Sequence, residues 1–469
     1  MSVMSPFWPQ PSSASAFRDR RRRLQDLLRA TGVGAAAFPS GWARPRNFEH
    51  NVYPFRAESH FLYLVGRALE GAILVVEHDA ARLFVTEPDP TAVVWNGAQP
   101  TLEQLSAALC IEVRPLDELE PSPDMAALPP QDQETADWLG ALLDREVIAC
   151  SGPELGGLDA ALAEALVTLR LRHDAAALAQ ITQAVQVTAA GHRAGLGVTG
   201  AELREAQVRA AMEREIYAAG MQPAYGSIVT VHGETLHETS YHRILRPGDL
   251  LLADVGAETP EGWAADVTRT WPVSGRFSST QRNLYEAVLG AQRAALACVR
   301  PGVRYIEVHR AAARALGTGL VALGVLRGDV EELYARGAIA LFFPHGIGHL
   351  LGLDVHDMED LGDRAGYVGG APRSPHPGEA ALRLDRVLEP DMVVTVEPGF
   401  YRNPELLGDA VRRGPLGDSV DWDELERYMD VRGIRIEDDV RVTETGAEVL
   451  TADIPKEPED VEALVGQLR

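Results

Sequence analysis

Residues 344–357 read PHGIGHLLGLDVHD, and this stretch is the most informative part of the chain for its architecture. It places His345, His349 and His356 within twelve residues, with glycines between them that permit close approach of other backbone. The HxxxH spacing of the first two resembles that of zinc peptidases, but no glutamate follows His345 and the glycines disfavour a helix. For any one of these histidines alone, a hydrogen-bonded structural role is the simpler interpretation. The stretch therefore predicts a site only together with residues elsewhere.

Two aspartates lie in strand-like apolar surroundings upstream of this stretch. Asp254 occurs in LLLADV (250–255), and Asp266 follows twelve residues later in AADVTRT (264–270). A carboxylate is costly to bury unless it is paired or binds a cation. A salt bridge is the ordinary explanation for one buried aspartate. Two that can meet across a short turn, with few basic neighbours, favour a metal ion.

Two glutamates downstream complete the set. Glu397 closes the apolar run MVVTVE before a Pro-Gly turn, so its carboxylate is expected at the end of a sheet. Glu437 lies in GIRIEDDV, where Arg435, Glu437 and Asp439 share one strand face by alternation, and an Arg–Glu surface pair is the simpler interpretation. With His349, the four carboxylates offer mostly hard oxygen ligands. These favour Mn²⁺ or a similar divalent ion over structural zinc.

Composition limits the class of protein. A chain of 469 residues predicts two domains. The net charge of −24 argues against nucleic acid or an anionic membrane as a partner. Three cysteines without CxxC spacing favour the reducing cytoplasm. No stretch approaches the roughly 18 apolar residues of a membrane helix, and the N-terminus does not resemble a signal peptide. The run Arg20–Arg23 predicts a solvated helix face.

The pattern along the chain predicts an α/β N-terminal domain over residues 1–168. Its expected elements are strands over 71–77 and 82–86 and helices over 102–109 and 134–143. The stretch 149–157 is rich in Gly, Pro and Ser and is expected as a hinge between domains.

Residues 169–469 predict a second, α+β domain. Long helices are expected over 174–195, 201–219, 280–299 and 305–323, between two blocks rich in strands. The segments 357–388 and 403–429 are expected as long loop insertions, and long ordered loops are often functional.

The metal-ligand candidates occur in an order, and with flanking residues, that closely resemble the pita-bread metallopeptidases. Their order is Asp254, Asp266, His349, Glu397 and Glu437. Within that group the chain is most similar to aminopeptidase P, the Xaa-Pro aminopeptidases. The similarity covers nearly the whole chain and includes FRAESHFLYLVG (55–66) and AVVWNG (92–97), which have no metal role. It implies a creatinase/prolidase-type N-terminal domain, a pita-bread catalytic domain, and hydrolysis of the bond that precedes proline.

By position, the resemblance implies two divalent metal ions, Mn²⁺ first and Zn²⁺ or Co²⁺ as alternatives. Asp254 would hold one ion and His349 the other. Asp266 and Glu437 would bridge both ions. Glu397 would complete the second ion and carry a proton to the leaving nitrogen.

The supporting residues implied in the same way are His237, His345, His356, Tyr401 and Arg435. His237 is chosen over His232 and His242 because it lies seventeen residues before Asp254, the family distance. Its flank departs from the family, since Glu238 stands where an aromatic residue is common. The resemblance also implies a cytoplasmic homo-oligomer, a dimer or tetramer. Trp95 matches a tryptophan that reaches a neighbouring subunit's active site in some relatives.

Three alternatives stay open. A prolidase, which cleaves Xaa-Pro dipeptides, needs a clamp for the free carboxylate, and Arg373 and Arg383 in the first insertion are available. A creatinase-like hydrolase shares the two-domain fold without metal, and five intact ligands argue against it. A non-catalytic binding protein on the same scaffold is the alternative from another class. The two insertions leave the preferred length of peptide open.

Overall fold

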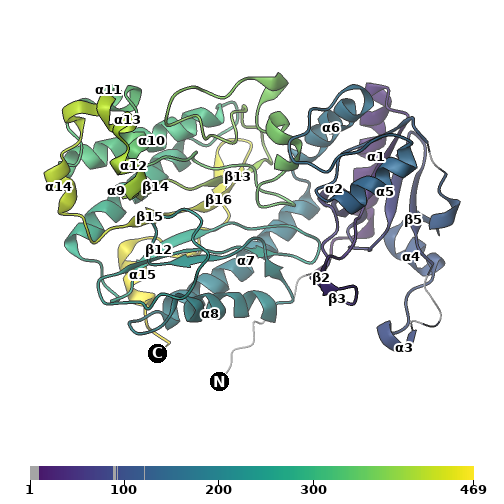
Figure 1. Cartoon of the computed structure of the whole chain (residues 1–469), viewed down its shortest axis with the longest axis horizontal. Helices are drawn as coiled ribbons and strands as arrows, with labels where there is room; N and C mark the ends of the chain where they lie inside the picture. Colours follow the sequence, from purple (N-terminus) through teal and green to yellow (C-terminus); the bar gives the residue numbers. More distant parts are fainter. Residues whose placement is uncertain (1–9, 88–90, 92, 121, 469) are drawn as a thin grey trace. The chain divides into compact units, whose positions relative to one another are not determined.

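The computed structural model describes residues 10–87, 91, 93–120 and 122–468. These residues form two compact units, coloured in chain order in Figure 1. The N-terminal unit comprises residues 10–176 and the short segment 358–365, and the C-terminal unit comprises 177–357 and 366–468. Part of the first expected insertion therefore belongs to the N-terminal unit, although the chain on both sides of it belongs to the other.

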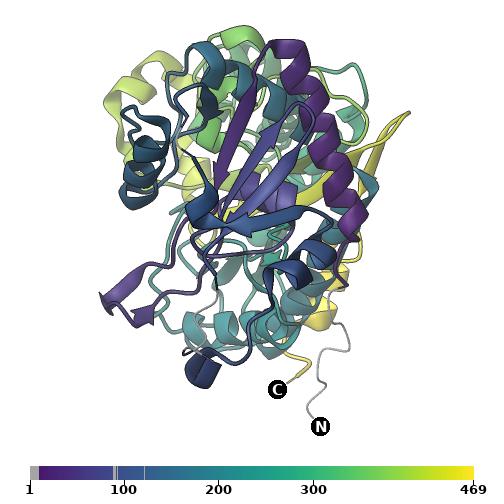
Figure 2. The ribbon, with the colours of Figure 1, turned by 90° about the vertical axis from the view of Figure 1, so that its right-hand side faces the viewer.

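The N-terminal unit is built on a five-stranded mixed sheet. Its strand order is β6 (Glu112–Pro115), β5 (Ala81–Val85), β4 (Ile73–Glu77), β1 (Ala35–Pro39) and β7 (Met125–Ala127). The two outer pairs are parallel and the two inner pairs antiparallel. The helices of this unit are α1 (Ala14–Thr31), α2 (Ser59–Val65), α3 (Val93–Asn96), α4 (Leu102–Leu109), α5 (Gln133–Leu143) and α6 (Gly157–Arg170). Figure 2 shows α1 lying along this sheet, and a small hairpin, β2 (Pro45–Phe48) and β3 (Asn51–Val52), projecting from it. The predicted strands and helices of this unit are confirmed.

The four-arginine run in α1 corrects one expectation. Arg20 and Arg21 are buried rather than solvated. Arg20 donates to both carboxylate oxygens of Asp174 at 2.7 and 2.9 Å, and Arg21 donates to the carbonyl of Leu64 at 2.7 Å. That carbonyl lies in the last turn of α2, where helix carbonyls lack backbone partners. The prediction of a solvated face was wrong for these two arginines because their partners come from distant segments.

The prediction of a domain hinge at 149–157 was wrong, because this stretch connects α5 to α6 inside the N-terminal unit. Helix α6 packs against α1 and β7 of that unit, which ends at Ala176. The expected domain limit between residues 168 and 169 falls within α6, eight residues before the end of the unit.

Long helices cover the sheets of the C-terminal unit. They are α7 (Ala175–Val198), α8 (Glu205–Ala218), α9 (Ser279–Cys298) and α10 (Tyr305–Ala322), close to the predicted ranges. Helix α9 begins with a capping box, in which the Ser278 hydroxyl accepts from the Gln281 amide at 3.1 Å and the Gln281 side chain accepts in return. Shorter helices follow at α11 (Val330–Ala335), η3 (Ile339–Leu341) and α15 (Pro458–Leu464).

The sheets of this unit are small and antiparallel. One has the order β12 (Thr268–Pro272), β10 (Leu250–Asp254), β9 (Ile228–Thr230), and another β13 (Val393–Val396), β16 (Asp438–Val442), β17 (Ala447–Val449). Two-stranded pairs join β14 (Gly399–Tyr401) with β15 (Gly433–Arg435) and β8 (Gln222–Pro223) with β11 (Ala257–Glu258). Strands β10, β12 and β13 are buried on both faces, which explains the nearly continuous apolar sequence of β10 and β13.

The two expected insertions differ. Segment 403–429 is a string of short helices: α12 (Pro404–Gly408), α13 (Ala410–Arg413), η6 (Gly414–Ser419) and α14 (Trp422–Glu426). The loop prediction was wrong there because it overlooked Asn403 and Asp421, which cap α12 and α14. Segment 357–388 is mainly irregular, with η4 (Glu359–Arg364) and η5 (Val368–Gly370).

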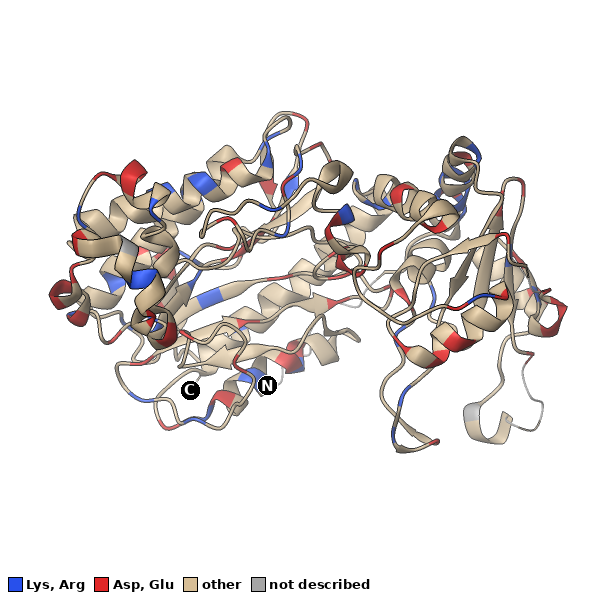
Figure 3. Cartoon of the chain, turned by 45° about the horizontal axis from the view of Figure 1, so that its top comes forward, with Lys and Arg blue, Asp and Glu red and all other residues tan. Residues whose placement is uncertain are grey.

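Acidic and basic residues are interspersed along both units, as the colouring of Figure 3 shows. Of the helices described, none combines the length and apolar character needed to cross a bilayer.

Candidate active site

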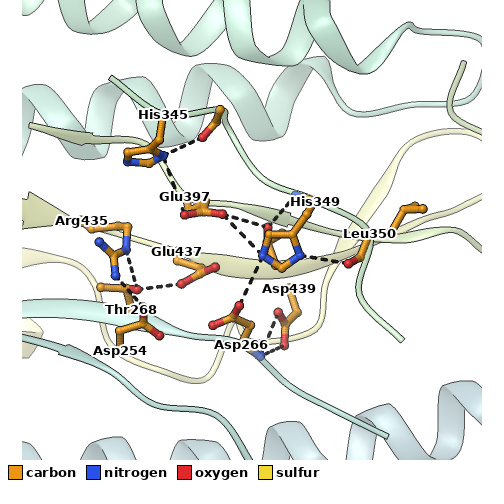
Figure 4. Close-up of polar contacts among 12 residues, drawn as sticks. Asp254, Asp266, Thr268, His345, His349, Leu350, Glu397, Arg435, Glu437 and Asp439 are labelled. Atoms are coloured by element: carbon orange, nitrogen blue, oxygen red, sulfur yellow. Dashed lines mark hydrogen bonds and ion pairs between the residues drawn. The ribbon is translucent and has the colours of Figure 1, made fainter. Parts of the chain in front are cut away.

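The ten residues singled out from the sequence converge in the C-terminal unit. Nine of them line one cavity of about 230 Å³, and Tyr401 lies just behind His345. Figure 4 shows four carboxylates gathered around His349, from segments spread over residues 254–437. These carboxylates are Asp254, Asp266, Glu397 and Glu437.

The turn between β10 and β12 brings the two aspartates together, as predicted. Asp254 is the last residue of β10 and pairs with Thr268, the first residue of β12. The Tyr225 hydroxyl lies 2.5 Å from an oxygen of Asp254 and 2.6 Å from an oxygen of Asp266. One hydroxyl carries one proton, so the second contact needs either a protonated carboxyl or a cation between the oxygens. The aspartate pair therefore fits a bound cation.

His349 is oriented for binding through one ring nitrogen. Its Nδ1 lies 2.9 Å from the Leu350 carbonyl and donates to it, which leaves Nε2 facing the carboxylates. Nε2 is 3.4 Å from Asp266 Oδ2 and 3.6 Å from Glu397 Oε1. This is the arrangement of a metal-binding histidine. Asp266, His349 and Glu437 each offer one ligand atom, and these three atoms all lie within 4.8 Å of one another.

Gly348 allows the backbone around His349 to pack closely against strand β13. A Cβ there would lie 2.5 Å from both the Thr395 Oγ1 and the Tyr305 hydroxyl. Thr395 Oγ1 also accepts from the His349 amide at 3.1 Å. The glycine therefore lets strand β13 approach the backbone that carries His349.

The charges of the cluster are unbalanced. Burial raises the pKa of Asp254, Glu397 and Glu437, and repulsion from neighbouring carboxylates raises it further. Burial also opposes ionisation of Asp266, but the hydrogen bond and charge of His349 lower its pKa. Burial alone would lower the pKa of His349, and Asp266 and Glu397 outweigh that effect and raise it to about 9. The excess of buried oxygen donors over cationic groups fits divalent metal ions.

Arg435 organises the side of the cluster around Asp254. Its guanidinium donates to Asp254 Oδ2 at 2.5 Å, to the Tyr401 hydroxyl at 3.1 Å and to Thr268 Oγ1 at 2.9 Å. Thr268 Oγ1 in turn donates to Glu437 Oε2 at 2.7 Å. Arg435 is buried, so the interpretation of an Arg–Glu surface pair was wrong. Strand β15 ends at Arg435, so Glu437 lies beyond the strand to which the alternation assigned it.

His345 is held in one tautomer. Its Nδ1 donates to the Gly346 carbonyl at 2.7 Å, and its Nε2 accepts from the Tyr401 hydroxyl at 2.9 Å. Burial and the charge of Arg435 lower the pKa of His345 to about 3. The imidazole is therefore neutral at physiological pH. The segment 344–350 contains no helix in the structure, as the glycines predicted.

Two further histidines line the cavity. The pKa of His237 is lowered by burial and by the charges of Arg435 and Arg383. The His356 ring lies 4.0 Å from the His349 ring, centroid to centroid. Arg383 comes from the first insertion, and among the described residues none of segment 403–429 lines the cavity. Only the first insertion therefore borders the site.

Sequence reasoning missed three residues with clear roles in the cluster. Asp439 is fully buried and accepts from the Asp266 amide at 3.2 and 3.3 Å. Thr395, opposite Asp439 in the β13–β16 register, supports His349. Alternation from Glu397 points to Thr395. Tyr225 lies just before β9, and nothing in the sequence around it indicates a role in the site.

Comparisons with known proteins show the family and the fold. Residues 179–444 match metallopeptidase family M24, and residues 17–128 match the aminopeptidase P N-terminal domain. The Xaa-Pro aminopeptidase of Escherichia coli (strain K12) is 33% identical over 464 residues, 95% of this chain and 97% of that protein. A probable Xaa-Pro aminopeptidase PEPP from Uncinocarpus reesii is 31% identical over 471 residues, 96% of this chain and 94% of that protein.

Solved structures extend the similarity to the fold. The aminopeptidase PepP of Pseudomonas aeruginosa has a TM-score of 0.78 at 30% identity, covering 97% of this chain and 98% of its own. Zn-substituted E. coli aminopeptidase P in complex with product has a TM-score of 0.78 at 30% identity, covering 98% and 100%. The predicted fold, an α/β domain followed by an α+β pita-bread domain, is confirmed. The chain belongs to metallopeptidase family M24 and carries the N-terminal domain of aminopeptidase P.

Proposed function

We propose that this protein is a metal-dependent Xaa-Pro aminopeptidase, which releases the N-terminal residue from peptides with proline in second position. The observation that carries the proposal is a cluster of four carboxylates and one imidazole around a single cavity, in which Asp254, Asp266, His349 and Glu437 are buried and Glu397 is partly exposed. It occurs in a chain that is 31–33% identical along most of its length to proteins named Xaa-Pro aminopeptidases.

We assign two divalent ions to this cluster. Asp254 would hold one ion, and His349 and Glu397 would hold the other. Asp266 and Glu437 would contribute ligands to both. The shared Tyr225 hydroxyl and the excess of buried carboxylate support this assignment. The preferred ion is Mn²⁺, with Zn²⁺ and Co²⁺ as alternatives, because the donors are mainly oxygen.

Such ions, when bound, acidify a water molecule and polarise the scissile carbonyl. The residues of the chain supply the remaining chemistry. Glu397 lines the cavity and accepts the proton of the attacking water. It then delivers this proton to the proline nitrogen, which carries no hydrogen in the substrate and must gain one for the C–N bond to break.

Imidazole donors stabilise the charge that develops on the carbonyl oxygen. His237 and His356 line the cavity as donors for that oxygen. His345 and His356 form the wall that receives the proline ring. Tyr401 and Arg435 hold His345 and Asp254 in place.

The direct test is incubation of the Mn²⁺-reconstituted protein with equimolar Ala-Pro and Ala-Pro-Ala, followed by mass spectrometry. Release of Ala and Pro-Ala from the tripeptide, with the dipeptide surviving, is the expected result. If neither peptide is cut while metal is bound, the proposed substrate class is wrong. Asp254→Asn, Asp266→Asn and Glu437→Gln should lose metal and activity together, and a variant that keeps both contradicts the ligand assignment.

One observation favours Xaa-Pro dipeptidase activity as the second candidate. Arg383 lines the cavity and offers a cation for a free carboxylate. Arg373 instead donates to the Leu382 carbonyl at 2.7 Å. Exclusive loss of Ala-Pro in the mixture above would establish this alternative. Arg383→Met should then remove the cleavage of the dipeptide first.

We further propose a cytoplasmic homo-oligomer, a dimer or tetramer. The three cysteines are unpaired, which suits a reducing compartment. Residues 1–168 would supply oligomer contacts and part of a neighbour's substrate site, and residues 169–469 the peptidase centre. Val94 and Trp95 on α3 are 80% and 85% exposed, as an interface residue of the free chain would be. Trp95→Ala should reduce the mass measured by light scattering.

A further inference from the structure

Glu379 is a buried carboxylate in the first insertion that has no part in the chemistry above. It is 3% exposed. Its Oε1 accepts from Arg310 Nε at 2.7 Å and from the Tyr334 hydroxyl at 2.6 Å, and its Oε2 accepts from Ser374 Oγ at 2.5 Å. Arg310 lies on α10 and Tyr334 on α11. One carboxylate therefore joins the insertion to two helices.

A histidine three residues earlier reinforces this attachment. The His376 ring stacks on the Tyr334 ring, with centroids 4.7 Å apart and planes 14° from parallel. Its Nδ1 accepts from the Gly378 amide at 3.2 Å, so its Nε2 carries the hydrogen and donates to the Tyr334 carbonyl at 2.8 Å. Tyr334 thus contacts the insertion through its hydroxyl, its ring and its backbone.

The chain that follows Glu379 runs directly into the active-site cavity. Ala381 and Arg383 line that cavity. The carbonyl of Leu382 between them accepts from the Tyr367 hydroxyl at 2.8 Å and from Arg373 at 2.7 Å. A Cβ on Gly346 would lie 3.0 Å from Leu382 Cα, so the insertion packs against the backbone beside His345. The insertion is a fixed wall of the cavity.

The Glu379 carboxylate is ionised at physiological pH. Burial would raise the pKa of Glu379, but hydrogen bonds from Arg310, Ser374 and Tyr334 outweigh it and lower the pKa to about 2. Bonds between ionised partners are about twice as strong as neutral ones. A carboxylate with several such bonds holds a segment of irregular backbone more firmly than the segment's own contacts would.

We propose that Glu379 is a positioning residue for substrate binding, because it fastens residues 371–383 to α10 and α11 and thereby fixes Ala381 and Arg383 at the cavity. The inference rests on the proposed peptidase function. It makes the insertion a rigid determinant of which peptides bind. Its effect should fall on KM, since Glu379 contacts neither the reacting atoms nor the proposed metal ligands.

The test uses full-length, Mn²⁺-reconstituted Glu379→Gln with Ala-Pro-Ala as substrate. KM should rise about tenfold or more while kcat changes less than about threefold, the pattern of lost substrate binding. Bound Mn²⁺ should equal that of the wild type. A KM within about twofold of the wild type, or a fall in kcat or Mn²⁺ content at unchanged KM, overturns the inference.

Two further variants keep the test decisive. Glu331→Gln is the matched control, because Glu331 pairs with Arg314 at 2.6 Å across the same two helices but is 62% exposed and does not touch the insertion. Its KM should stay within about twofold of the wild type. Ser374→Ala removes one hydrogen bond and leaves the Arg310–Glu379 ion pair intact, so it tests the inference even if Glu379→Gln fails to fold. It should raise KM about threefold, and an unchanged KM overturns the inference.

A double variant examines the route through Arg383. If Glu379 acts by placing Arg383, Glu379→Gln/Arg383→Met should have a KM within about twofold of Arg383→Met alone. If the increases in KM of the two single variants multiply in the double variant, Glu379 does not act through Arg383. Failure of the wild type to cut Ala-Pro-Ala would refute the proposed function itself, which separates the two claims.

Discussion

The substitution Gly348→Ala should disable the site without removing any of its functional groups. The new Cβ would lie 2.5 Å from Thr395 Oγ1 and from the Tyr305 hydroxyl, and closer still to the Thr395 carbonyl. Tyr305 donates to that same carbonyl, so β13 cannot easily retreat. Ordinary contact begins at 3.4 Å, so the backbone on one side must move by about 1 Å.

The consequence for activity follows from the next residue. His349 receives its backbone support from Thr395 Oγ1, and its Nε2 faces the proposed metal position. A misplacement of about 1 Å in a catalytic group lowers the rate by roughly 10²-fold. Overpacking of a buried site should cost about 1–3 kcal/mol in the free energy of unfolding.

The assay compares kcat/KM for Ala-Pro-Ala, bound Mn²⁺ and urea unfolding between Gly348→Ala and the wild type. Gly290→Ala in α9 is the control, because a Cβ there meets no atom within 4 Å. The control should keep full activity and gain about 0.5–1 kcal/mol of stability. If Gly348→Ala keeps kcat/KM within about threefold of the wild type, with full Mn²⁺ content, the reasoning is refuted.

Three other outcomes are expected. Dialysis against a chelator should abolish peptide hydrolysis and lower Tm, because the four clustered carboxylates then repel one another. Added Mn²⁺ should restore both, and activity that survives chelation contradicts the metal-dependent reaction. Arg21→Met should lower the free energy of unfolding by about 1–3 kcal/mol, since the Leu64 and Cys110 carbonyls lose their donor. The control is Arg22→Met at the neighbouring exposed position, which should change the free energy of unfolding by less than about 0.5 kcal/mol. Asp360→Asn should flatten the pH dependence of stability, followed by urea unfolding from pH 3 to 8.

The sign of that last effect follows from the His60–Asp360 pair, whose Nε2 and Oδ2 atoms are 3.1 Å apart within the N-terminal unit. Burial would lower the pKa of His60, but Glu58 and Asp360 raise it above 6.5, so its contribution is present below pH 6.5 and is lost at higher pH. Burial would raise the pKa of Asp360, but His60 lowers it below 3.8, so its contribution is present above pH 3.8 and is lost in acid. The pair therefore stabilises most between about pH 4 and 6.5. A profile of Asp360→Asn parallel to the wild type would contradict this account.

The local elements were predictable because helix and strand formation depends on near neighbours. Helix α4 was predicted to the residue, and α9 and α10 within one residue at each end. The ligand candidates could also be identified from the sequence. Carboxylates in apolar surroundings are too costly to bury without a purpose, and four of them together with His349, in a family order, point to one site.

Contacts between distant segments could not be predicted. The Tyr225 hydroxyl contacts both Asp254 and Asp266 only because β9, β10 and β12 align in one register. The Asp439 carboxylate accepts a hydrogen bond from the Asp266 amide, although the two residues are 173 positions apart in the sequence.

Three further features also depend on contacts between distant segments. They are the burial of Arg21, the place of segment 358–365 in the N-terminal unit, and the attachment of the cavity wall through Glu379. Periodicity along the chain carries information about which face of an element is buried. It carries none about which distant group a buried charge will meet, because that partner is chosen by the packing of the whole unit.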